Sequence, residues 1–129
     1  MSNTNASKGG AARENRLVGW LVSYEMDNKG KSFEIRAGRS LMSSENSQDK
    51  RVITVRENSV SAPHVALSAS PRHKVMVQDI FSEFGTYLTK AASGKELEVQ
   101  GPTELEHGDW LRIGDKTRLQ VCLIDGPRR

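Results

Sequence analysis

Short runs of alternating apolar and polar residues begin at Leu17 and continue almost to the end of the chain. In the first run every second residue is apolar, which is the period of a strand with one buried face. The turn Asp27–Gly30 follows, and Phe33 and Ile35 then alternate with polar neighbours, so the chain is expected to fold back as a hairpin. The side chains predicted to share the buried face of the first strand are Val18, Trp20, Val22, Tyr24 and Met26.

Eight further apolar runs are predicted to be strands, and Gly, Pro, Asn or Ser separate most of them. No apolar repeat of about 3.6 residues continues long enough to predict a helix. A series of short strands with regular turn signals is typical of a sandwich or a barrel, so the sequence predicts an all-β fold. The predicted strands are Ser40–Met42, Arg51–Val55, Val65–Ala69, Lys74–Gln78, Tyr87–Thr89, Glu96–Val99, Asp109–Ile113 and Arg118–Ile124.

The chain of 129 residues is long enough for one domain with a core of its own. Residues 1–16 are rich in Ser, Asn, Ala and Gly and have no apolar period, which predicts a flexible tail. We expect one domain over residues 17–125 and a short tail over residues 126–129. Aromatic residues make up 5% of the chain, so the core is expected to be aliphatic.

Charged residues make up 27% of the chain, but the net charge is only +3 and both signs are interspersed. This mild balance does not predict a nucleic-acid partner. Cys122 is the sole cysteine, which excludes an internal disulfide and a cysteine-based zinc cluster, and it is interpreted as an inert thiol. No run is long enough for a membrane span and no signal peptide is evident, so a soluble cytoplasmic protein is expected.

Four short motifs that could form a binding site follow one another along the chain. The second contains a serine and a histidine three residues apart at the mouth of a strand, a pair that by itself could be catalytic, metal-binding or structural. In order, the motifs are Gly38-Arg39, Ser61-Ala62-Pro63-His64, the turn from Asp79 to Phe84-Gly85-Thr86, and Gly108-Asp109 followed by Ile113-Gly114.

In that order the motifs resemble the forkhead-associated (FHA) domain, a β-sandwich that binds phosphothreonine peptides. No single motif is specific, but the succession of all four within one small domain is. The resemblance covers roughly Val18–Ile124. It implies an all-β, FHA-like β-sandwich of about eleven short, mostly antiparallel strands with the ligand loops at one end, in a bacterial-type signalling protein.

The resemblance also implies which residues hold the ligand. A phosphothreonine adds about −1.5 to −2 charges and three acceptor oxygens, which a guanidinium fork matches well. Arg39 and Ser61 would contact the phosphate, with Gly38 turning the backbone and His64 supporting the loop from behind. The other implied phosphopeptide-binding positions are Ala62, Phe84, Gly85 and Thr86.

Several positions depart from the family pattern. Ala62 stands where many members have a basic residue, Phe84 replaces the asparagine of Asn-Gly-Thr, Glu83 places an acid nearby, and Ser43-Ser44 replaces a frequent Ile-Gly turn. These changes could weaken phosphate binding by a factor of roughly a hundred. The alternative function is therefore a degenerate FHA scaffold that assembles complexes by phosphate-independent contacts. Phe84 is expected either to fold into the core or to lie exposed as an anchor for a protein partner.

Catalysis by Ser61 and His64 is not expected, because no orienting acid or nucleophile-elbow pattern accompanies them. No metal or other cofactor is expected either, since Asp79, Asp109 and Asp115 are interpreted as turn and strand-end residues. The expected partner is a phosphothreonine protein or peptide, such as a substrate of a Ser/Thr kinase. Thr4 in the N-terminal tail is a candidate self-ligand of the same kind.

Overall fold

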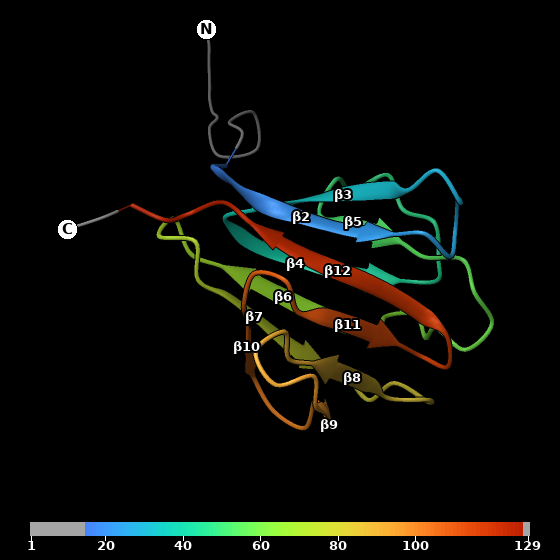
Figure 1. Ribbon diagram of the computed structural model, residues 1–129. Coiled ribbons are helices and arrows are strands. Elements are labelled where there is room, and N and C mark those ends of the chain that lie inside the picture. The colour runs from blue at the N-terminus through green and yellow to red at the C-terminus, as the bar shows by residue number, and fades with distance from the viewer. Residues whose placement is uncertain (1–14, 128–129) are drawn as a thin grey trace, which may run out of the picture.

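The computed structural model describes residues 15–127, which fold into two β-sheets (Figure 1). Within these residues no helix has the length and apolar content needed to cross a membrane. The strands are β2 (Leu17–Ser23), β3 (Lys31–Arg36), β4 (Gly38–Ser43), β5 (Val52–Thr54), β6 (Val65–Ala69), β7 (Val75–Asp79), β8 (Thr86–Thr89), β9 (Glu96–Glu98), β10 (Thr103–Leu105), β11 (Trp110–Ile113) and β12 (Thr117–Leu123).

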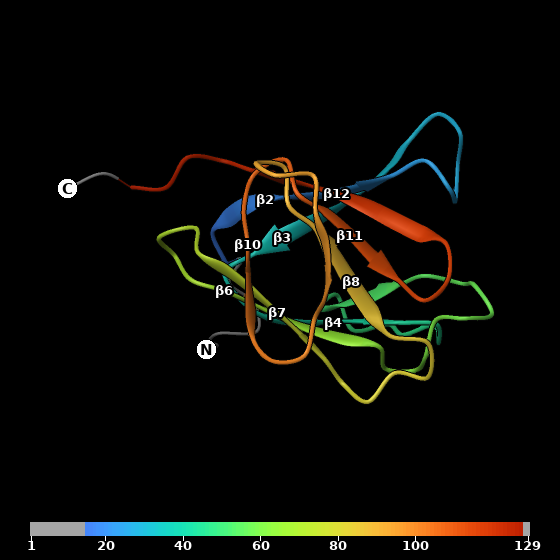
Figure 2. The same ribbon diagram turned by 60° about the horizontal axis from the view of Figure 1, so that its bottom comes forward.

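The strands form a five-stranded sheet in the order β10-β7-β6-β4-β5 and a six-stranded sheet in the order β3-β2-β12-β11-β8-β9. Neighbouring strands are antiparallel except β4 and β5, which are parallel. Figure 2 shows the two sheets as separate layers, with β2, β12 and β11 in one and β6, β7 and β4 in the other. The prediction of a mostly antiparallel, all-β sandwich is confirmed.

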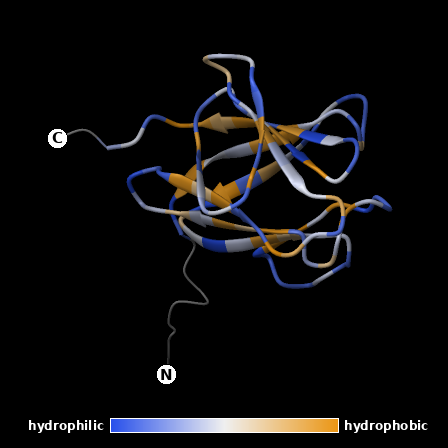
Figure 3. Ribbon diagram, turned by 90° about the horizontal axis from the view of Figure 1, so that it is seen from below, coloured by the Kyte–Doolittle hydropathy of each residue, from blue (hydrophilic) through white to orange (hydrophobic). Residues whose placement is uncertain are grey.

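Aliphatic side chains from both sheets fill the space between the layers. Leu21 and Leu111 of one sheet and Met42 and Leu67 of the other are each at most 1% exposed. Full burial of such a side chain contributes about 1.5–3 kcal/mol, so this layer is the main source of stability. Among the described residues no aromatic side chain is buried, and Figure 3 shows hydrophobic residues concentrated on the strands.

The prediction that Trp20, Val22 and Tyr24 face the core is wrong. Leu21 and Ser23 occupy the inner face of β2 at 0% exposure, whereas Tyr24 is 60% exposed. The register between β2 and β3 shifts at the start of β2, as at a β-bulge, and this shift sets which face turns inward. Because β2 is apolar on both faces, alternation alone could not choose between them.

The remaining predicted strands are present, with ends that differ by at most two residues. The strand that was not predicted is β10, which pairs with β7 at the edge of the five-stranded sheet. Three residues are too few for an apolar period to show in the sequence.

The two ends of the sandwich differ. β2 begins and β12 ends at the same end, with Leu123 opposite Gly19. There Arg16 Nε donates to His73 Nε2 at 2.7 Å, and His73 Nδ1 donates to Ile124 O at 2.7 Å. We call this the terminal end, on the left of Figure 1, and the opposite end the loop end. The loop end carries residues 24–30, 55–64, 80–85 and 114–116.

Candidate functional site

His64 joins two loops of the loop end from inside the protein. Its side chain is 0% exposed. The Ser61 backbone N–H donates to Nδ1 at 2.9 Å, so Nε2 carries the ring proton and donates to Gly85 O at 2.8 Å. Both ring nitrogens are therefore occupied, and neither can take a proton from a serine hydroxyl. His64 acts here as a support for the loops.

The Ser61 hydroxyl lies between the same two loops. Its oxygen accepts a hydrogen bond from the Glu83 backbone N–H at 3.0 Å, and the Ser61 carbonyl accepts one from the Ser44 N–H at 3.1 Å. The hydroxyl hydrogen has no acceptor among residues 15–127. A hydroxyl that is fixed through its oxygen and still has a proton to donate is suited to an anionic ligand.

Asp79, at the end of β7, holds the loop 80–85 in one conformation. Its carboxylate accepts from the Ser82 N–H at 3.1 Å, the Ser82 hydroxyl at 2.5 Å and the Thr86 hydroxyl at 2.6 Å. Burial raises the pKa of Asp79, but the hydrogen bonds from Ser82 and Thr86 outweigh burial and hold that pKa below its ordinary value. The carboxylate is therefore ionised at neutral pH and keeps these bonds.

Thr86 is buried and Gly85 is half-buried, and both bond to other parts of the protein. Thr86, one of the expected ligand-binding positions, is 0% exposed, and its hydroxyl donates to Asp79. The Gly85 carbonyl accepts from both His64 and the Gly114 N–H, the latter at 3.0 Å. The φ of 90° at Gly85 lies in the region that favours glycine. Both residues set the shape of the loop.

Ser59 connects the loop 55–64 to the turn between β11 and β12. Its oxygen accepts from the Asp115 N–H at 2.8 Å, and its hydroxyl donates to Glu57. Gly114 packs so closely that a Cβ there would lie 2.7 Å from Ser59 O. The hydrogen bond from the Ser59 hydroxyl lowers the pKa of Glu57, and the nearby Lys116 acts in the same direction.

Arg39 does not lie with Ser61. In β4 it pairs with Ser68 near the terminal end, and Gly38 beside it turns the backbone there with a φ of 113°. The opposite end of β4 leads to Ser44, which contacts Ser61. The strand between Arg39 and Ser44 spans about 16 Å. Arg39 and Ser61 are therefore too far apart in this structure to hold one phosphate together.

A polar hollow of about 380 Å³ lies at the loop end next to the Ser44–Ser61 contact. The exposed Arg56 side chain has no hydrogen-bond or ion-pair partner among the residues that the structure describes. An unpaired guanidinium in a polar hollow is available for an anion. The residues that line the hollow are Ser44, Arg56, Glu57, Asn58 and Val60.

Two phenylalanines lie on the loop 80–85, which contacts Ser61 through the Glu83 backbone N–H. Phe84 is 44% exposed, so it lies outside the core and the core interpretation is wrong. Phe81 is 99% exposed and has a φ of 52°, a conformation that is rare for a bulky residue. Ala62, on the neighbouring loop, is also exposed. Apolar side chains therefore flank the candidate site.

Sequence reasoning missed Arg56, Phe81 and the role of Asp79 as an acceptor. Arg56 directly follows a predicted strand and precedes Ser61, and that position at a strand end was the available signal. Nothing in the sequence indicated the backbone conformation of Phe81. Within residues 15–127 no group of three His, Cys, Asp or Glu side chains could hold a metal ion.

Comparison with protein families identifies this arrangement. The family model described as the FHA domain matches residues 35–114, which run from β3 to the end of β11 and include the loops around Ser61 and Gly85. No curated protein matches the chain.

Solved structures with the same fold include three from different organisms. The yeast Dun1 FHA domain, in complex with a doubly phosphorylated peptide derived from Rad53, has a TM-score of 0.68 and 20% identity over 97% of this chain and 87% of its own. An FHA domain from Arabidopsis thaliana has a TM-score of 0.67 and 17% identity over 95% of this chain and 99% of its own.

The third is EmbR of Mycobacterium tuberculosis, in complex with a low-affinity phosphopeptide. It has a TM-score of 0.65 and 16% identity, and the match covers 88% of this chain but only 26% of the EmbR chain. At these identities the three structures share the fold with this chain.

Proposed function

The chain belongs to the forkhead-associated domain family, and on that basis we propose that it is a module that binds phosphothreonine peptides without catalysing a reaction. The observation that carries the proposal is the fixed Ser61 hydroxyl, which has a proton to donate at the loop end. Two proteins with the same fold, Dun1 and EmbR, have phosphopeptides in their structures. The ligand would be a phosphothreonine segment of a Ser/Thr kinase substrate, encountered in the cytoplasm.

Arg56 is the cation of the proposed site, in place of Arg39. It lies in the hollow that Ser44 also lines, and Ser44 contacts Ser61. A phosphate there would accept bonds from a guanidinium and one or two hydroxyls, which is the donor set that its three oxygens require. Glu57 in the same hollow repels the anion, so the expected affinity is modest.

The first test is a fluorescence-polarisation titration of the full chain with a degenerate phosphothreonine peptide library. The unphosphorylated library is the control ligand. Arg56→Ala should weaken phosphopeptide binding by roughly 10- to 100-fold, because it removes hydrogen bonds from a charged donor. Arg39→Ala is the matched control, since it removes an equally exposed arginine at the other end of β4.

Phosphate-selective binding that Arg56→Ala reduces and Arg39→Ala leaves unchanged is the expected result. Equal binding of the two libraries by the folded protein would contradict the phosphopeptide function. Selective binding that depends on Arg39 and not on Arg56 would contradict the assignment of the cation.

A second candidate function is phosphate-independent assembly with a protein partner. The observation that favours it is the exposed pair Phe81 and Phe84 beside the site. A bulky residue kept in a strained conformation with its whole ring in water is typical of a functional contact. In this case Glu83, which lies between the two phenylalanines in the sequence, would favour a partner without a phosphate.

Replacement of both phenylalanines by alanine separates the two candidates. Under the second candidate, the interaction with a native partner is lost in Phe81→Ala/Phe84→Ala and kept in Arg56→Ala. The opposite pattern would reject it. The control is Leu97→Ala, which removes another exposed apolar side chain, 43% exposed, from the edge strand β9.

Thr4 lies outside the described residues, and its role as a self-ligand stays a proposal. The peptide that contains phosphorylated Thr4 is one ligand to include in the titration. The expected result is binding that depends on Arg56, as for other phosphothreonine peptides. Binding of this peptide no tighter than the library average would argue against a self-ligand.

A further inference from the structure

The outward face of the five-stranded sheet carries a second, larger hollow. Its volume is about 680 Å³, and it lies over β5, β4, β6 and β7. Leu41, Val52, Ala66 and Met76 line it, and all four are half-buried apolar residues. Sites of a few hundred cubic ångströms with a mainly apolar lining are of the size and character that ligands occupy.

The register of the sheet places three of these apolar residues side by side. Leu41 lies opposite Val52 on one side and opposite Ala66 on the other. Met76 continues the floor on β7, where it pairs with Ser68. These residues alternate with core residues such as Met42 and Leu67 along their strands, so their side chains point away from the core.

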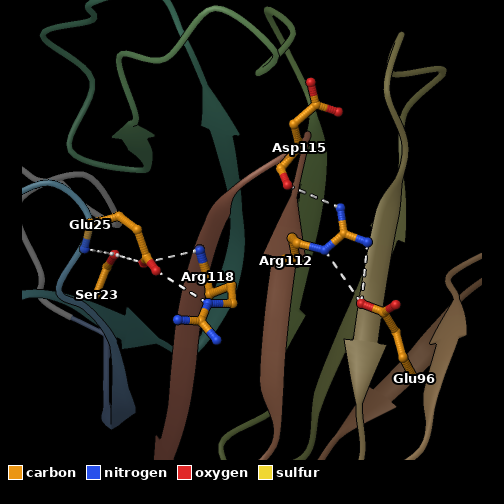
Figure 4. A network of polar contacts seen from close by, with 6 residues as sticks. All are labelled: Ser23, Glu25, Glu96, Arg112, Asp115 and Arg118. Atoms are coloured by element: carbon orange, nitrogen blue, oxygen red, sulfur yellow. Dashed lines mark hydrogen bonds and ion pairs between the residues drawn. The ribbon is translucent and has the colours of Figure 1, made fainter.

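On the outward face of the six-stranded sheet, by contrast, Arg112 and Arg118 lie in a network of polar contacts with neighbouring residues (Figure 4). Arg112 bonds Glu96 at 3.2 Å and lies 4.3 Å from the ring centre of Tyr87. Arg118 bonds Glu25 at 3.2 Å and lies 5.6 Å from the ring centre of Trp110. Tyr87 and Trp110, both half-buried, thus each have a paired cation over the ring.

No comparable cover lies over the hollow of the five-stranded sheet among the described residues. The ion pair at its edge joins Arg51 and Asp49 at 3.3 Å, and the Arg51 side chain is 73% exposed. Arg39 also lines the hollow, is exposed, and has no hydrogen-bond or ion-pair partner within the part of the chain that the structure describes. The hollow therefore combines an apolar floor with one uncompensated positive charge.

We propose that this hollow binds an extended segment of a partner protein that presents aliphatic side chains to the floor and one carboxylate to Arg39. The carboxylate compensates the guanidinium, and the pair becomes stronger as the bound segment excludes water. Four neighbouring strands span about 14 Å, which an extended chain crosses with about four or five residues. The site goes beyond the proposed phosphopeptide function and does not depend on it.

The two sites are far enough apart to be occupied together. Arg39 and Ser44 are at opposite ends of β4, about 16 Å apart along an extended strand, and Ser44 belongs to the loop end. The chain would thus bind a phosphothreonine segment at the loop end and an acidic, aliphatic segment on the sheet face.

The test uses backbone amide spectra of the full chain and two unphosphorylated peptide libraries of seven residues. Both libraries have Leu, Ile or Val at positions 2 and 4, so that these side chains share a face with position 6. Position 6 is Glu in the first library and Lys in the matched control. Each library is also made with the reversed sequence, so that a peptide can bind in either chain direction. The Glu library should shift the amides of residues 39–41, 66–68 and 76–78, with at least tenfold tighter binding than the Lys library.

Arg39→Glu should reduce binding of the Glu library at least tenfold, and Arg56→Glu should leave it unchanged. No shifts on the sheet face, equal binding of both libraries, or insensitivity to Arg39→Glu would each overturn the proposal. A phosphothreonine library added to the same samples monitors the loop end separately. Loss of phosphopeptide binding alone would count against the proposed function and not against the sheet-face site.

Discussion

Single polar side chains, buried or half-buried, determine the geometry of the loop end. His64, Asp79 and Thr86 are each held by partners from a different segment of the chain. In all three the polar side-chain atoms bond to other parts of the protein. These residues therefore shape the site, and other side chains must contact the ligand. Ser61 and Arg56 are among the side chains there that keep unused hydrogen-bonding capacity.

Thr86→Val is expected to destabilise the fold by about 1.5–3 kcal/mol, because it removes a buried hydrogen bond to a carboxylate without changing the side-chain shape. Urea unfolding measures the loss. Phosphopeptide affinity at a temperature where the variant is folded should change by less than a few-fold. A variant of unchanged stability that loses phosphopeptide binding would show instead that Thr86 contacts the ligand.

The position of Arg39 along its strand could have been derived from the sequence, but the family motif implied a position beside Ser61. The pair Gly38-Arg39 has the letters of a family motif. Only Ala37 separates β3 from β4, however, so Arg39 must lie close to the turn that ends β3. Since β3 begins at the loop end, that turn is at the terminal end. A dipeptide carries no information about its position along a strand, whereas strand lengths do.

At the scale of elements, the loops of the loop end are joined by backbone contacts that tolerate little extra volume. Gly114 adopts a φ of 68°, and a Cβ there would lie 2.7 Å from Ser59 O. The turn between β11 and β12 can therefore approach the loop 55–64 only because residue 114 has no side chain.

Gly114→Ala is expected to cost about 3 kcal/mol or more, since strain in the left-handed region adds to overpacking. Gly94→Ala is the matched control. Gly94 has a φ of 70° and nothing within 4 Å of its Cβ position, so its replacement should cost about 1–2 kcal/mol, from strain alone. Thermal unfolding of both variants measures the difference. Equal losses would mean that the contact with Ser59 relaxes without cost.

Element prediction succeeded where residues that favour turns or loops bound a short apolar run. Val65–Ala69 was predicted with the bounds that the structure has, because the apolar residues there are bounded by Pro63 and Ser70. For β2 the strand was predicted but its buried face was wrong, because both of its faces are apolar. The bulge that orients β2 depends on its pairing with β3. Exposure of Phe84 likewise depends on how Asp79 holds the loop, which a sequence pattern does not encode.

At the scale of the whole molecule, ionised carboxylates support both ends of the sandwich. Asp79 does so at the loop end. At the terminal end Asp109, 1% exposed, accepts from Lys90 Nζ at 2.8 Å and from the backbone N–H of Ala91 at 2.9 Å. Burial raises the pKa of Asp109, but these bonds outweigh burial and keep that pKa below its ordinary value. Burial lowers the pKa of Lys90, but its hydrogen bonds to Asp109 and Glu106 outweigh burial and raise that pKa.

Acid should therefore destabilise the protein. The folded state holds these two carboxyl groups at a lower pKa than the ordinary 3.8 of the unfolded chain, so the unfolded state takes up protons first as pH falls. Their contribution is complete above that value and is lost as pH falls through the folded pKa. Urea unfolding at pH values from 7 to 3 measures the decline. A flat profile would contradict this account.

Asp109→Asn tests the contribution of the terminal end. We expect a loss of about 1.5–3 kcal/mol at pH 7, because the ion pair with Lys90 is broken. The further loss between pH 5 and 3 should be smaller than in the unchanged protein, since one titrating carboxyl group is gone. An equally steep decline would mean that other carboxylates account for the acid sensitivity.

The adjacency of β2 and β12 also has a mechanical consequence. Because Gly19 lies opposite Leu123, a load applied through residues 15 and 127 would pull two antiparallel strands apart from the end at which both are held. The hydrogen bonds between them would then break one after another, as in unzipping. A load applied through residues 15 and 116 would shear all of them at once. In an optical trap the first geometry should yield at clearly lower force. This fold therefore resists a pulling force well when it is applied through residues 15 and 116, and poorly when it is applied through residues 15 and 127.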